Sequence, residues 1–118
     1  MALNMINTTT ITAKSLAKEL TTAEVTMLEN PVVSNKIFKI NSILISNIDG
    51  TNAADSTVSL YKSGVAYKIA STISVPPDST LVLLDRNSSI YLEETDKITA
   101  LAGANSDLNI FINYEELS

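Results

Sequence analysis

The 118-residue chain contains no histidine, cysteine or tryptophan, and only three glycines and three prolines. Without cysteine it can form neither disulfides nor thiolate metal sites, and without histidine it lacks the commonest general base and transition-metal ligand. Ser-His-Asp catalysis and zinc catalysis of the usual types are therefore excluded. Carboxylates, lysine, tyrosine and serine remain, but they form no evident reaction centre. We expect a protein that is not an enzyme and uses no cofactor.

Charge and hydropathy exclude two kinds of partner. The formal net charge of −5, without a cluster of lysine and arginine, disfavours nucleic acid, whose binding depends on attraction to phosphates. No apolar run approaches the roughly 20 residues needed to span a bilayer, and the N-terminal residues do not form a secretory signal. A hydrophobic content of 45% with 18% charged residues is typical of a folded chain. We expect an N-terminal arm at residues 1–10 and a single domain at residues 11–118.

Alternation of apolar and polar residues predicts an all-β fold. The clearest stretch is 36–64, which predicts a long strand, a turn at Asp49-Gly50 and a second strand, and so resembles a hairpin. Residues 11–30 fit either helix or strand, and their threonine content together with Pro31 favours two strands, 11–20 and 24–28. Turn signals recur about every 8–12 residues. We predict an antiparallel β-sandwich, jelly-roll-like, with about eight strands.

Some apolar residues lie on strand faces that alternation assigns to solvent. In the strand at 36–48, Phe38, Ile40 and Leu44 share one face, while Ile43 and Ile45 lie on the other. Such residues are covered either within one subunit or by another copy. Each sheet of a two-layer sandwich has only one inner face, which favours contact between copies and a homo-oligomer, for which we expect a trimer. The candidate subunit-interface residues are Ile43, Ile45, Val82, Leu84 and Phe111.

Two acidic segments could hold a cation, but each is better explained as a turn. Glu93, Glu94 and Asp96 lack the ligand spacing and the glycine of a calcium loop, so a solvated turn is favoured. The segment Asp49–Asp55 consists of ordinary turn residues. No metal site is predicted.

The four tyrosines leave open a sugar-binding alternative. Tyr61 and Tyr91 could stack on host glycans, whereas alternation places Tyr67 and Tyr114 on apolar faces, as core or interface residues. The absence of tryptophan disfavours a glycosidase.

Four stretches occur in one ordered series: INSILISNIDGTNAADSTVSLY (40–61), ISVPPDSTLVLLD (73–85), IYLEETDKITALAGANSDLNI (90–110) and INYEELS (112–118). The series resembles small virion structural proteins of tailed, marine-type bacteriophages. Pro77-Asp78 and Thr95 depart from that pattern, because the family often has glycine or small residues there.

The resemblance implies a non-enzymatic component of the virion, assembled in the host cytoplasm. Within that class we favour a capsid decoration or cement protein that binds other virion proteins, the major capsid protein first among them. A neck, tail or fibre component is the alternative.

Overall fold

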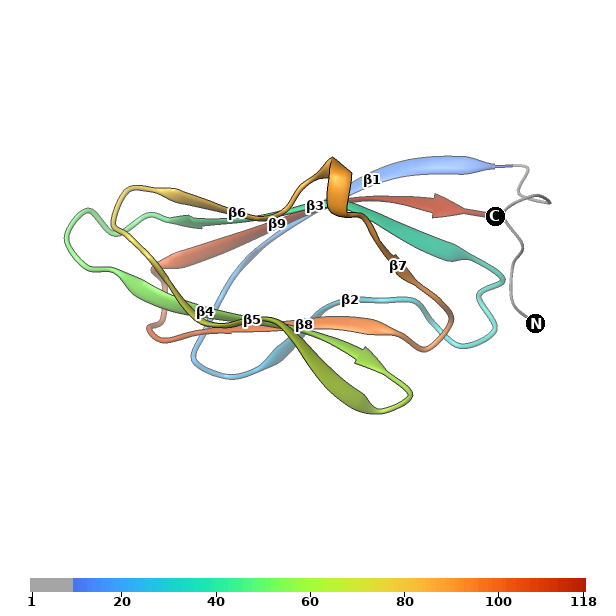
Figure 1. Ribbon diagram of the computed structural model, residues 1–118, viewed down its shortest axis with the longest axis horizontal. Coiled ribbons are helices and arrows are strands. Elements are labelled where there is room, and N and C mark those ends of the chain that lie inside the picture. Colours follow the sequence, from blue (N-terminus) through green and yellow to red (C-terminus); the bar gives the residue numbers. More distant parts are fainter. Residues whose placement is uncertain (1–9) are drawn as a thin grey trace.

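The computed structural model describes residues 10–118, which form two antiparallel β-sheets packed face to face (Figure 1). The strands are β1 (Ile11–Glu19), β2 (Val25–Glu29), β3 (Ile37–Asn47), β4 (Ala54–Lys62), β5 (Val65–Val75), β6 (Thr80–Leu84), β7 (Ile90–Leu92), β8 (Lys97–Ala102) and β9 (Leu108–Leu117), with the short 3-10 helix η2 (Arg86–Ser88) between β6 and β7. The five-stranded sheet has the order β1-β9-β3-β6, with β7 also paired to β3, and the four-stranded sheet has the order β2-β8-β4-β5. The predicted β-sandwich is confirmed.

The order of the strands is that of a jelly roll. The chain crosses between the sheets after β1, β2 and β3, and β9 and β8 then lie between these early strands in their respective sheets. β6 and β7 pair with successive parts of β3, as two halves of one sheet edge that η2 interrupts. Residues 11–30 contribute the two strands β1 and β2, as favoured from their composition.

The prediction of a hairpin over residues 36–64 was wrong. β3 belongs to the five-stranded sheet and β4 to the four-stranded sheet, so the connection at residues 48–53 crosses the sandwich. Asn47 stabilises this crossing, because its side-chain amide donates to the carbonyls of Asn52 and Val75, each at 2.9 Å. The tight hairpin is β4–β5, whose turn residues Ser63 and Gly64 both have positive φ, as a two-residue turn of this kind requires.

A β-bulge in β3 reverses its alternation halfway along. Asn41 has no partner in β9, since Ile40 pairs with Tyr114 and Ser42 with Asn113. Phe38 and Ile40 face the core before the bulge, and Ile43 and Ile45 face it afterwards. One extra residue therefore moves every later side chain of the strand to the opposite face.

The core lies between the sheets and consists of aliphatic side chains with one aromatic pair. Phe38 and Tyr114 pack with ring centroids 5.5 Å apart. Ile40, Leu92 and Ile98 are completely buried beside them. Burial of one such side chain stabilises the fold by about 1.5–3 kcal/mol.

The two departures from the phage pattern lie at turns with positive φ. Asp78 has φ 55° and Thr95 has φ 75°, the region that favours glycine. The turn conformation that glycine would favour is therefore kept here by non-glycine residues.

Candidate contact site

Apolar side chains form a row across the outer face of the five-stranded sheet. Ala17 pairs with Phe111, Phe111 with Leu44, and Leu44 with Val82. All four lie on the face opposite the core, because they alternate along their strands with residues that pack into it: Leu16, Ile43, Ile45, Leu81, Ile110 and Ile112. Val82 is 59% exposed and Phe111 37% exposed. We call this row and the outer face around it the contact face.

The middle of the contact face carries no charge. On one side of the row lie Ser15, Asn113 and Ser42, where the Asn113 amide donates to the Ser42 hydroxyl at 2.8 Å. On the other side Asn109 pairs with Ser46. Charges begin only at the ends of the face, with Glu19 at one end and the pair Lys39 and Glu115 at the other. Depletion of charge around an apolar centre is typical of protein interfaces.

The outer face of the four-stranded sheet is of a different kind. Lys97, the first residue of β8, pairs with Glu29 on one side and Tyr61 on the other. Lys68 lies on the edge strand β5 and pairs with Ser59 on the same face. Lysines thus lie at one end and at one edge of this second face.

Two shallow depressions flank the edge strand β1 of the contact face. One, of about 260 Å³, is lined by Ala17, Lys18, Glu19, Asn109 and Phe111. The other, of about 350 Å³, is lined by Ala13, Lys14, Ser15, Asn41, Asn113 and Tyr114. Each contains one of the two alanines that β1 presents on this face, so the small side chains leave room for another molecule to enter.

The structure separates the five predicted interface residues into two groups. Ile43 and Ile45 are completely buried and Leu84 is 6% exposed, so the prediction that they face outward was wrong. The bulge at Asn41 accounts for the first two residues. A second register shift accounts for Leu84, because Ile43 pairs with Leu84 and Leu44 with Val82, which leaves Leu83 as the extra residue in β6. Val82 and Phe111 do lie on the outer face.

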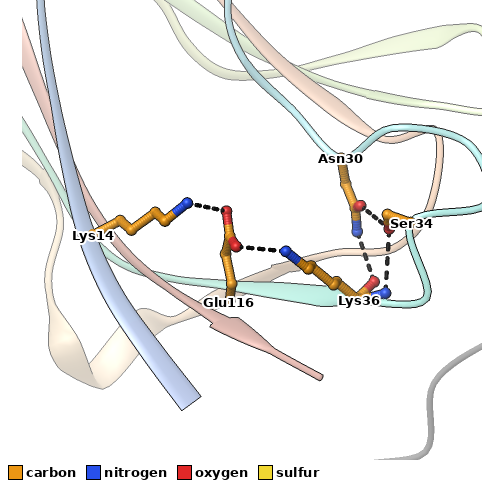
Figure 2. A network of polar contacts seen from close by, with 5 residues as sticks. All are labelled: Lys14, Asn30, Ser34, Lys36 and Glu116. Carbon is orange, nitrogen blue, oxygen red and sulfur yellow. Dashed lines mark hydrogen bonds and ion pairs between the residues drawn. The ribbon is translucent and has the colours of Figure 1, made fainter. Parts of the chain in front are cut away.

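An ion-pair cluster fastens β1 to the rest of the sheet (Figure 2). Glu116, whose side chain is only 11% exposed, binds Lys14 Nζ at 3.1 Å and Lys36 Nζ at 3.0 Å. Burial raises the pKa of the Glu116 carboxyl, but the hydrogen bonds and positive charges of Lys36 and Lys14 outweigh burial and hold the pKa below its usual value. The cluster keeps the edge strand in place, and with it the alanines of the contact face.

This cluster predicts a loss of stability in acid. A carboxyl whose pKa is lowered by folding contributes stability above its unfolded pKa and loses it as the pH falls through the folded pKa. Both lysines are more than a third exposed, so solvent screens them, and we expect Glu116→Gln to cost about 1–2 kcal/mol at pH 7. Urea unfolding of both proteins from pH 7 to pH 3 should show the difference shrinking below the usual glutamate pKa. A difference that stays constant over this range would contradict the prediction.

The acidic segments have structural partners. Asp96 is buried rather than solvated, and its carboxylate accepts hydrogen bonds from Lys62 Nζ at 2.5 Å and from the Glu93 amide at 3.0 Å. Asp49 accepts from the amides of Thr51 and Asn52, and these bonds hold its pKa below the usual value. Within residues 10–118 no group of three or more acidic side chains could hold a metal ion.

The structure does not bring Tyr61 and Tyr91 together. Tyr61 lies on β4 of the four-stranded sheet, where its hydroxyl bonds Glu24 and its ring lies 5.0 Å from Lys97 Nζ. Tyr91 lies on β7 of the other sheet and is 43% exposed. Of the remaining two, Tyr114 is buried as predicted, whereas Tyr67 is 57% exposed.

Sequence reasoning missed the residues that complete the contact face. Ala17 and Leu44 join Phe111 and Val82 in the row, and Lys39 and Glu115 border it. These residues come from separate strands, so only the register between strands shows that they are neighbours. The alternation within β9 was the one usable signal, since it marks Phe111 as an apolar residue on a polar face.

Comparisons with known proteins support the fold. No family model matches the chain and no curated protein matches it significantly. A subunit of Bacillus endospore appendages, described as a novel family of disulfide-linked pili, matches with a TM-score of 0.54 and 17% identity over 92% of this chain and 87% of that one. A pentameric capsid protein from metagenomic phage sequences matches with a TM-score of 0.42 and 13% identity over 88% of this chain and 62% of that one. No helix among the described residues is long and apolar enough to cross a membrane. The TM-score of 0.54 shows that the pilus subunit shares the fold of this chain.

Proposed function

We propose that this protein is a non-enzymatic structural component of a phage virion, a capsid decoration or cement protein whose copies pack together through the contact face. The observation that carries the proposal is the exposed, uncharged apolar row formed by Ala17, Phe111, Leu44 and Val82. Exposed apolar patches with polar borders mark interaction sites. Assignment to a virion rests on the sequence resemblance carried by the four ordered stretches.

The chemistry of the chain agrees with a structural role. It has no histidine or cysteine, and its most buried carboxylates, Glu116 and Asp96, are occupied by lysines. The contact face carries only side chains suited to packing and hydrogen bonding. Because cysteine is absent, disulfides cannot join the copies.

Attachment to the shell is assigned to the N-terminal arm, of which residues 1–9 lie outside the described residues. Thr10 is fixed beside the C-terminal end of β9, where it exchanges two backbone hydrogen bonds with Ser118, at 2.8 and 2.9 Å. Thr10 itself lies at one end of the sandwich, beyond the uncharged middle of the contact face. Binding to the major capsid protein through the arm therefore leaves that face available to another copy.

Deletion of residues 1–9 should weaken attachment to phage capsids and leave folding intact. The deletion keeps the backbone bonds between Thr10 and Ser118, so we expect the melting temperature to change by no more than a few degrees. Co-sedimentation with capsids that lack the protein measures attachment. Unchanged occupancy on the particles would contradict the role of the arm.

A neck, tail or fibre position is the second candidate, and the likeness of the fold to a pilus subunit favours it. The number of copies per particle distinguishes the two. Hundreds of copies indicate decoration of the capsid, whereas small multiples of three to about twelve indicate a neck or tail. The trimer expected from the sequence remains a prediction, to be tested by the mass of the assembly in solution.

A further inference from the structure

We propose that the contact face binds a second copy of itself, in a face-to-face dimer with a two-fold axis that runs parallel to the strands between β9 and β3. The inference rests on the proposed function, because it names the occupant of the same face. It does not depend on the phage shell or on the arm. The argument comes from the register of the sheet.

Such an axis places β9 of one copy over β3 of the other, and β1 over the edge formed by β6 and β7. In the apolar row, Phe111 then lies over the partner copy's Leu44, and Ala17 over its Val82. The large Phe111 side chain thus faces the smaller Leu44, and the small Ala17 faces the branched Val82. Val82, whose side chain is 59% exposed, points at the depression beside Ala17 and Phe111.

The same operation matches the row at the charged end of the face. This row consists of Ala13, Glu115, Lys39 and Tyr91, which pair in that order across β1, β9, β3 and β7. Glu115 comes to lie over the second copy's Lys39, and by symmetry each dimer forms this ion pair twice. Tyr91, 43% exposed, lies over Ala13 and its depression.

The polar row at the other end is also compatible with itself. Asn109 lies over the second copy's Ser46, and Glu19 over its Thr80. Amide and hydroxyl groups can exchange hydrogen bonds, and a threonine hydroxyl can donate to a carboxylate. No like charges are opposed in any row, which is what a self-complementary two-fold contact requires.

The area is sufficient for a stable pair. β1, β9 and β3 are nine to eleven residues long, and the fourth edge consists of β6 with five residues and β7 with three. At about 4.8 Å between strands and about 3.3 Å per residue, the face measures at most roughly 19 × 30 Å. Two copies then bury at most about 1,100 Å², close to the roughly 1,000 Å² expected of a biological interface. Parallel alignment of the strands also matches the aligned class of sheet packing.

Cysteine pairs test this geometry sharply, since the chain has no cysteine of its own. Ala17→Cys mixed with Val82→Cys should form a disulfide-linked dimer under mild oxidation, whereas neither variant alone should do so. Within one chain these positions are three strand spacings apart, about 14 Å, which is too far for an internal disulfide. The variant with both substitutions should stop at a covalent dimer. Covalent trimers or a longer ladder would overturn the two-fold axis, and so would the absence of crosslinking both by mild oxidation and by a short bismaleimide, which can span the roughly 10 Å between packed sheets.

A matched pair of valine variants tests the face in solution. Val82→Glu should weaken the dimer at least about tenfold, because it places a carboxylate over Ala17 of the other copy. Val65→Glu is the control, since Val65 is similarly exposed, at 50%, but lies on β5 of the other sheet. Sedimentation equilibrium of the full chain measures the dimer dissociation constant of each variant. An equal loss of dimer affinity in the two variants would overturn the dimer, and so would a wild-type protein that stays monomeric at high concentration.

The two proposals can fail separately. If a monomer still decorates phage capsids, the dimer and the packing of copies through the contact face are overturned, and only the virion role of the proposed function stands. If the dimer forms as described but does not bind capsids, the virion role fails and the dimer stands.

Discussion

Ile43→Ala is expected to lower the free energy of unfolding by about 2–5 kcal/mol, whereas Leu44→Ala, one residue further along β3, should cost less than about 1.5 kcal/mol. Ile43 is completely buried between the sheets, so its truncation leaves a cavity that the core cannot fully close. Leu44 lies on the outer face and is only half-buried, so solvent fills the space that its truncation leaves. The two substitutions together report which side of the strand faces the core.

Urea unfolding at concentrations low enough to keep the protein monomeric measures both values. Low concentration matters because Leu44 belongs to the contact face, and its truncation would otherwise also change the dimer. A larger loss for Leu44→Ala than for Ile43→Ala would mean that β3 has uninterrupted alternation and no bulge at Asn41. Deletion of Asn41 would then shift the second half of the strand out of phase, whereas with the bulge the deletion removes only the extra residue and leaves Ile43 and Ile45 facing the core.

This comparison also shows how far the sequence could predict the fold. The positions of the strands and the turns between them were predictable, because alternation and turn residues are local signals. The sheet to which each strand belongs was not, since the turn after β3 has the same residues whether the chain returns to its own sheet or crosses to the other. Nor could local alternation reveal the extra residues Asn41 and Leu83, whose effect depends on the partner strand.

The candidate site was predictable to the same extent. Phe111 was identifiable because its own strand marks it as an outward apolar residue. Val82 lies in a run of four apolar residues, where no alternation shows which of them face out. Its place beside Leu44 follows from strand pairing, as does the match between Lys39 and Glu115 that supports a two-fold contact.

Two buried asparagines, one at each end of the sandwich, are a further feature that the sequence alone does not reveal. Asn47 ends β3 and bonds the carbonyl of Val75 at the end of β5, so it links the two sheets at one end. Asn30 follows β2 and links them at the other end, through Leu92 of β7. In the sequence both look like ordinary turn residues. In the structure each satisfies carbonyls that would otherwise be buried without a donor.

Asn30→Ala is therefore expected to lower the free energy of unfolding by about 2–4 kcal/mol, which is the second large effect on stability. Asn30 is completely buried and its amide donates to the carbonyls of Lys36 at 2.8 Å and Leu92 at 2.9 Å, while its oxygen accepts from the Ser34 hydroxyl (Figure 2). Alanine leaves both carbonyls without that donor, and each buried group left unsatisfied costs roughly 1–3 kcal/mol.

Two variants separate this explanation from a simple loss of packing. Asn30→Asp keeps the shape but removes both N–H donors and directs a carboxylate at two carbonyl oxygens, so at pH 7 it should be at least as destabilising as alanine. Asn113→Ala is the control, because that amide bonds Ser42 on an exposed face and its loss should cost no more than about 0.5 kcal/mol. If aspartate at position 30 were tolerated at pH 7, the amide donors could not be what joins the sheets at this end, and shape alone would explain why an asparagine is buried there.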